Sequence, residues 1–255
     1  MLTSNSHSYQ IFKQLVTYIG LAYLLSWVIW LPLYGHEFGW TDMPALPMNH
    51  AMGGLGPLIA SFLTTWMFLG MKGLKVLLAR CFQIKPFLYL VIALCSPFIL
   101  ACLAGLLSSI ITKQPLDLSG IFDAKEFPEW NILTIFIYNF VFFGYGEEVG
   151  WRGFALPRLQ FNVHALSASI LLTVIWALWH LPLFFYRPGY TTMEWTGMLG
   201  WVFSLLTGSI LLTWLYNSSR ASILICAVFH STIDIAFTAN FADQNMMNYL
   251  GFLIT

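Results

Sequence analysis

Two adjacent glutamates, Glu147 and Glu148, follow an apolar run that reads NILTIFIYNFVFFGYG, and Arg152 comes one helical turn later. On a helix, residues four apart lie on one face, so Glu148 and Arg152 are predicted to form an ion pair. Glu147 is rotated by about 100° from Glu148 and has no comparable partner in this motif. We therefore expect one carboxylate to be neutralised by a guanidinium and the other to be desolvated, as a general base requires.

Two later motifs place imidazoles in apolar sequence. Trp176-Ala-Leu-Trp-His180 puts an aromatic ring and an imidazole on one helix face, and His230-Ser-Thr-Ile-Asp234 puts an imidazole and a carboxylate one turn apart. Together with Glu147, these groups could hold a water molecule and polarise a peptide carbonyl. His180, His230 and Asp234 are also a ligand set that Zn²⁺ could use. The alternative for a single histidine such as His180 is a hydrogen bond between two helices.

The composition places these polar groups in a membrane. The chain is 58% hydrophobic and 9% charged, with a mean hydropathy of +0.74, whereas a soluble domain carries about 25% charged residues. A carboxylate inside a membrane must be paired, protonated or put to use, because lipid offers neither water nor counter-ions. The ionisable groups of the three motifs therefore indicate an active site.

Seven apolar stretches reach the span length of about 20 residues. They lie at 11–34, 49–70, 86–111, 131–150, 165–185, 196–216 and 221–239. An eighth begins near residue 245 and is too short to span unaided. We predict an all-α, polytopic transmembrane helical bundle of seven to eight spans, because open sheet edges cannot face lipid. It forms a single transmembrane domain, 1–255, whose motif-bearing protease core covers about 130–236. No cleavable signal peptide is expected.

The basic residues are distributed unevenly between the predicted loops. If the N-terminus is cytoplasmic, three of them lie outside, and the eight on the inside are Lys13, Lys72, Lys75, Arg80, Lys85, Arg152, Arg158 and Arg220. The positive-inside rule counts only Lys and Arg, so it favours an integral protein of the cell membrane with a cytoplasmic N-terminus. The predicted loop 71–85 alternates basic and apolar residues and could lie along the cytoplasmic surface; the favoured alternative is that its charges only set the topology.

In their order and spacing, the three motifs resemble those of the CPBP family of intramembrane proteases, which includes CAAX prenyl endopeptidases and bacteriocin-processing proteins. The family motifs EExxxR, FxxxH and HxxxN/D lie on consecutive helices of an eight-span bundle. The resemblance covers roughly residues 130–236 and rests on Glu147 to Arg152, Trp176 to His180 and His230 to Asp234.

The resemblance also implies roles for the individual residues. Glu147 would be the general base that activates water, with help from His180. His230 and Asp234 would stabilise the oxyanion. Glu148 and Arg152 would hold the first motif together.

The chain departs from the family pattern at two positions. Trp176 stands where the family usually has phenylalanine, which keeps the aromatic wall but enlarges it. Asp234 stands at a position that is asparagine in some members, and an ionised aspartate cannot donate a hydrogen bond to an oxyanion. Asp234 must therefore be protonated, orient His230 or bind a metal. The family is classed with metalloproteases, although a metal-independent glutamate and histidine mechanism also fits these residues.

We therefore expect an intramembrane endopeptidase, a CPBP-type metalloprotease or glutamate endopeptidase. It would hydrolyse peptide bonds of membrane-associated or lipid-modified peptides by Glu/His-activated water. Its expected partners are a peptide or membrane-protein substrate and the lipid bilayer, and no nucleic acid. The alternative is a non-catalytic membrane immunity factor or a small-solute transporter that uses the same polar cluster. A transporter would more often contain inverted repeats, and the sequence shows none.

Overall fold

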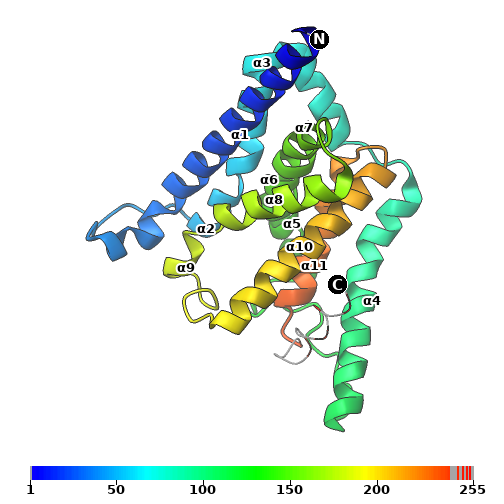
Figure 1. The fold of residues 1–255 in the computed structure, drawn as a ribbon. Coiled ribbons are helices and arrows are strands. Elements are labelled where there is room, and N and C mark those ends of the chain that lie inside the picture. Colours follow the sequence, from blue (N-terminus) through cyan, green and yellow to red (C-terminus); the bar gives the residue numbers. More distant parts are fainter. Residues whose placement is uncertain (1, 242–245, 247–248, 250, 252, 254–255) are drawn as a thin grey trace.

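The computed structural model describes residues 2–241 together with residues 246, 249, 251 and 253, and over these residues the chain is a bundle of helices (Figure 1). No strand is formed in this part of the chain, where an isolated antiparallel bridge joins Ala124 to Ala239. The all-α fold expected from the composition is confirmed, and the protein is an integral membrane protein.

Within the described residues, six helical segments are long and apolar enough to cross a membrane. They are His7–Phe38, Asn49–Cys81, Phe87–Thr112, Ile132–Gln160, Ala165–Tyr186 and Trp195–Ser218. A seventh apolar helix, α11 (Ile223–Thr238), is shorter. These seven elements correspond to the seven predicted stretches. The eighth stretch, near residue 245, falls mostly outside the described residues.

The first three segments contain α1 (Leu2–Tyr34), η1 (Gly35–Phe38), α2 (Asn49–Gly54), α3 (Gly56–Cys81) and α4 (Phe87–Thr112). Helix α1 runs along one side of the bundle and α4 along the other, with the remaining helices between them (Figure 1). Helix α1 packs mainly against α3, and α4 packs mainly against α11.

The prediction of a surface loop at 71–85 is wrong for most of its length, because α3 continues to Cys81. Gly70 interrupts the helix with φ 61° and ψ −159°, a conformation that only glycine adopts easily, and the chain then resumes its helical course. In the resumed part, Leu77 and Cys81 are buried while Lys72 and Lys75 are exposed. A helix is favoured here because it buries the apolar residues and leaves the lysines outside.

The fourth segment lies in the centre of the bundle and consists of five consecutive helical pieces. They are α5 (Ile132–Asn139), η2 (Phe140–Tyr145), α6 (Gly146–Gly150), η3 (Trp151–Ala155) and α7 (Leu156–Gln160). Both η2 and η3 are π-helical, and all five residues of α6 between them are buried. A π-helical turn widens the helix and shifts the angular position of the residues that follow. The two glutamates therefore lie on a short α-helical piece that is enclosed on all sides.

The central segment packs unusually closely against the end of α2. A Cβ atom added to Gly146 would lie 2.6 Å from the carbonyl oxygen of Gly54, and one added to Gly54 would lie 2.6 Å from that of Phe142. Glycine at these positions lets two backbones touch. The close approach fixes the height of α6 in the bundle.

The fifth to seventh segments complete the bundle. They contain α8 (Ala165–Trp179), α9 (Leu183–Tyr186), α10 (Trp195–Ser218) and α11. The predicted span 165–185 is therefore broken between α8 and α9, where Pro182 follows His180. Helix α8 has 15 residues and is about 22 Å long, which is shorter than a hydrocarbon core of about 30 Å. The C-terminal end of α8 consequently lies in the interior of the bundle.

Candidate active site

Glu147 on α6 is 4% exposed, and its two carboxylate oxygens have different surroundings. Oε2 accepts a hydrogen bond from Nε1 of Trp176 at 2.7 Å and a longer one from Nε1 of Trp151 at 3.3 Å. Oε1 has no hydrogen-bond partner among the side chains and backbone groups that the structure describes. One oxygen is thus fixed by two indoles, and the other can accept a proton.

Glu148, the next residue, forms the predicted ion pair with Arg152. Nη1 of Arg152 lies 2.8 Å from Oε1 of Glu148, and both side chains are completely buried. The guanidinium also lies over the indole of Trp176, with Cζ 4.9 Å from the ring centroid. A cation over an aromatic face is stabilised by the ring quadrupole, more so when both are desolvated.

His230 on α11 lies between two carboxylates. Its Nδ1 is 2.8 Å from Oε1 of Glu148, the same oxygen that binds Arg152. Its Nε2 is 3.5 Å from Oδ2 of Asp234, an ion-pair distance longer than an ordinary hydrogen bond. The Asp234 side chain is 34% exposed. Of the three roles open to Asp234, this arrangement matches that of an orienting partner for His230.

His180 lies at the break between α8 and α9. Its Nδ1 is 2.7 Å from the carbonyl oxygen of Trp176. A carbonyl oxygen only accepts hydrogen bonds, so Nδ1 carries the hydrogen and Nε2 of the neutral ring carries a lone pair. The ring is packed among Trp176, Trp179 and Trp201, with centroid distances of 5.8, 4.8 and 5.7 Å. His180 is therefore fixed in orientation, with an accepting nitrogen.

The indole of Trp176 connects the three motifs. It donates to Glu147, lies beneath the guanidinium of Arg152, and contacts the rings of His180 and His230 at 5.8 and 5.7 Å. The structure therefore brings together all six residues proposed from the sequence: Glu147, Glu148, Arg152, His180, His230 and Asp234. They come from α6, η3, the end of α8, and α11.

The residues expected to bind zinc do not form a compact ligand set. In the described part of the chain, no three His, Cys, Asp or Glu side chains are grouped so that they could hold a metal ion. This includes the predicted set of His180, His230 and Asp234. Both ring nitrogens of His230 already face carboxylates.

Two residues near the site were not foreseen from the sequence. Trp151 lies in the first motif, four residues after Glu147, so the two side chains share a helix face. Tyr18 on α1 is fully buried and packs against Trp151 and Phe154, with centroid distances of 5.7 and 4.8 Å. Its hydroxyl has no hydrogen-bond partner among the described residues, and neither do Oε2 of Glu148 and two nitrogens of Arg152. In the sequence, Tyr18 could have been noticed as a hydroxyl-bearing side chain within the first apolar stretch.

An ion pair connects the loop between α4 and α5 with the loop that follows α9. Nη1 and Nη2 of Arg187 donate to the two carboxylate oxygens of Glu126 at 2.8 and 2.7 Å. These hydrogen bonds hold the pKa of Glu126 below its usual value. Because both side chains are partly exposed, the pair contributes at most about 1 kcal/mol to stability.

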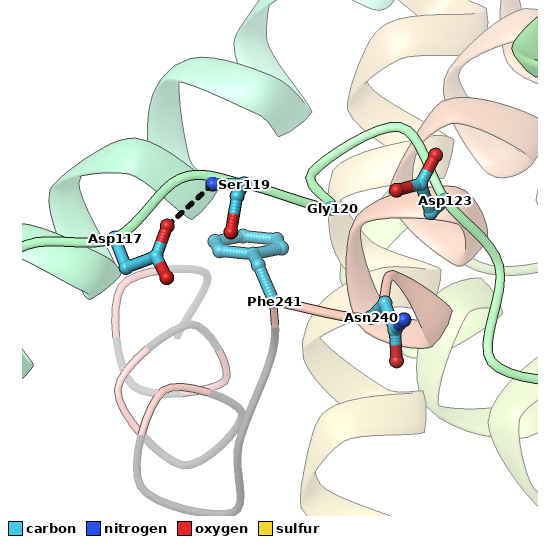
Figure 2. A pocket seen from close by; sticks show the side chains of 6 residues that line it. All are labelled: Asp117, Ser119, Gly120, Asp123, Asn240 and Phe241. Atoms are coloured by element: carbon cyan, nitrogen blue, oxygen red, sulfur yellow. Dashed lines mark hydrogen bonds between the residues drawn. The ribbon is translucent and has the colours of Figure 1, made fainter.

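Figure 2 shows a polar hollow of about 440 Å³ in the loops beyond α4 and α11. Its lining residues are Asp117, Ser119, Gly120, Asp123, Asn240 and Phe241. None of the residues of the three motifs lines it. The hollow is therefore separate from the candidate active site.

Comparison with known proteins points to the same part of the chain. Residues 129–236 match the model of the family described as type II CAAX prenyl endopeptidase, Rce1-like. The CAAX prenyl protease 2 of Methanococcus maripaludis is 37% identical over 94 residues, which is 35% of this chain and 34% of that protein. The chain thus covers about a third of the length of the curated relative that it matches. The matched family segment contains all three motifs.

Proposed function

We propose that the chain is an intramembrane endopeptidase of the Rce1-like family of type II CAAX prenyl endopeptidases, whose model its residues 129–236 match. Its proposed substrates are membrane-associated or lipid-modified peptides, of which prenylated peptides with a C-terminal CAAX sequence are the first to test. The observation that carries the proposal is the asymmetry of Glu147: two indoles hold one oxygen, and the other is free to accept a proton.

In the proposed reaction, Oε1 of Glu147 takes a proton from a water molecule while the water oxygen attacks the carbonyl carbon of the scissile peptide bond. The carbonyl oxygen becomes negatively charged in the tetrahedral intermediate. Glu147 then gives the proton to the leaving nitrogen, and the C–N bond breaks. One water molecule is consumed, and the products are a new carboxyl group and a new amine.

The other site residues position this reaction. Nε2 of His180 accepts the second hydrogen of the attacking water, because its Nδ1 is occupied by the Trp176 carbonyl. His230 has its Nδ1 bound to Glu148, while its Nε2 lies 3.5 Å from Asp234, longer than an ordinary hydrogen bond, and can donate to the negative charge that develops on the carbonyl oxygen. Arg152 neutralises Glu148, so that Glu148 can orient His230 at low cost in a buried site.

The central test is the substitution Glu147→Gln, which keeps the size of the side chain and removes the base. The purified protein is placed in lipid nanodiscs and given an internally quenched, farnesylated CAAX peptide. We expect a loss of about 10²- to 10⁴-fold in kcat/KM, the usual contribution of a general base. Glu129→Gln, a change at an exposed loop glutamate, is the matched control and should leave the rate unchanged.

Continued cleavage by the Glu147→Gln protein would rule out Glu147 as the base, whereas absence of cleavage by the unmodified protein would favour the non-catalytic alternatives. Mass spectrometry of the peptides that accumulate uncut in cells producing this variant identifies the natural substrate. Elemental analysis of the active protein tests the metal separately. The mechanism proposed here requires no stoichiometric zinc, and activity that depends on bound zinc would overturn that part of it.

We also propose that the N-terminus faces the cytoplasm and that the protein resides in the cell membrane. Seven of the eleven lysine and arginine residues then lie on the inside and three on the outside, as the positive-inside rule requires, while Arg152 is buried in the central segment. In this orientation α7 and the start of α8 are on the cytoplasmic side, and the ion pair between Glu126 and Arg187 is on the outside.

A further inference from the structure

Trp176 supplies a hydrogen bond that the phenylalanine usual at this position cannot make. Its Nε1 lies 2.7 Å from Oε2 of Glu147, and the side chain is 6% exposed. Phenylalanine would preserve the aromatic contacts with His180 and His230 but has no donor. The difference between the two residues at this position is therefore one hydrogen bond to the proposed base.

We propose that Trp176 is a positioning residue, an inference that rests on the proposed function. Its indole N–H fixes one oxygen of Glu147 and so aims the other at the attacking water. Trp151 supports the same oxygen from one helical turn further along, at the longer distance of 3.3 Å. A carboxylate can rotate about its last bond, and two donors on one oxygen remove that freedom. The base is thereby ordered before substrate arrives.

The bond from Trp176 also affects the charge of Glu147. A hydrogen bond donated to a carboxylate favours its charged form, and bonds to charged acceptors are stronger than those between neutral groups. The other charged or titratable groups that act on Glu147 are Glu148 and Arg152 on its own segment, His180 beside α8, and His230 and Asp234 on α11. Tyr18 on α1 and Tyr190 in the loop after α9 also interact electrostatically with it. Phenylalanine at this position leaves all of these side chains in place and keeps an aromatic ring beside Arg152, His180 and His230, so the main change that a shift in pH dependence would report is the loss of this bond.

The test is Trp176→Phe, assayed in nanodiscs with the farnesylated CAAX peptide. We expect kcat to fall about 10-fold with KM nearly unchanged, the effect of losing one hydrogen bond to a charged group. The acidic limb of the rate profile should move to higher pH by about one unit. A residue that acted only by filling space would change stability and leave the pH profile in place.

Trp30→Phe is the matched control. Trp30 is also buried, and its indole donates to a backbone oxygen, that of His50, at 2.7 Å. The substitution removes the same atoms from the core without affecting Glu147. We expect it to lower thermal stability and to leave the pH profile where it is in the unmodified protein.

A Trp176→Phe protein with the pH profile of the unmodified enzyme, and with kinetic constants like those of Trp30→Phe, would overturn the inference. That result leaves the proposed function intact, whereas absence of cleavage by the unmodified protein would remove the function itself, and full activity in Glu147→Gln would remove the role of Glu147 as the base. If Trp176→Phe fails to fold, ultraviolet resonance Raman spectra of the unmodified protein and of Glu147→Ala decide the matter. Loss of a strongly hydrogen-bonded indole band in Glu147→Ala supports the inference, and identical indole bands overturn it.

Discussion

At the scale of single residues, Oε1 of Glu148 lies 2.8 Å both from Nη1 of Arg152 and from Nδ1 of His230. One carboxylate oxygen thus connects the first motif to the third. Because Glu148 and Arg152 are fully buried, loss of either partner would leave a charge without compensation, which costs about 3–5 kcal/mol. Glu148 holds His230 in place, while Glu147 is left for its proposed role as the base.

The substitution Arg152→Lys tests this arrangement. Lysine keeps the charge but cannot reproduce the planar guanidinium that binds Glu148 and lies over Trp176. We expect partial loss of turnover and a denaturation midpoint about 4–8 °C lower in detergent, for a loss of about 2 kcal/mol. Arg220→Lys, at an exposed position, is the control. Unchanged turnover and melting for Arg152→Lys would argue against the ion pair as a support of the site.

At the scale of elements, irregular helix geometry places the reactive groups. The two π-helical turns η2 and η3 flank α6, and π-helical turns often occur at functional sites. His180 is the residue that follows α8, at the break before α9, and it is buried in the interior. The site is thus assembled where the fourth and fifth segments depart from regular α-helices.

The substitution Gly146→Ala tests the close packing that holds α6. Its Cβ would lie 2.6 Å from the backbone oxygen of Gly54, an atom that cannot move without shifting α2. We expect a destabilisation of about 1–3 kcal/mol, the usual cost of overpacking, together with loss of activity. Gly200→Ala on α10 is the matched control, because a Cβ there meets no atom within 4 Å. Equal stability of the two variants in denaturation experiments would refute this account of the packing.

At the scale of the whole molecule, the bundle has a central segment that is enclosed by the other helices (Figure 1). The proposed orientation predicts which loops are reached from which side of the membrane. In a protein whose four native cysteines are replaced by alanine, a cysteine at Glu129 should react with a membrane-impermeant maleimide in intact cells. A cysteine at Lys72 should react only after the membrane is opened. The opposite labelling pattern would reverse the topology.

Relations within one helix could be predicted from the sequence alone. The ion pair between Glu148 and Arg152 and the proximity of His230 to Asp234 follow from the periodicity of a helix, and the seven apolar helices follow from the thickness of a bilayer. The exception was the stretch 71–85, where exposed lysines obscured the buried face of a helix.

Relations between helices were decided only by the tertiary structure. Trp176 reaches Glu147 across 29 residues of sequence, and His230 reaches Glu148 across 82. No periodicity links positions so far apart, because their distance depends on how helices pack, on the glycine contacts that set the height of α6, and on the break after α8. The letters of the three motifs identified the reacting groups, and packing determined which oxygen of Glu147 is held and which is free.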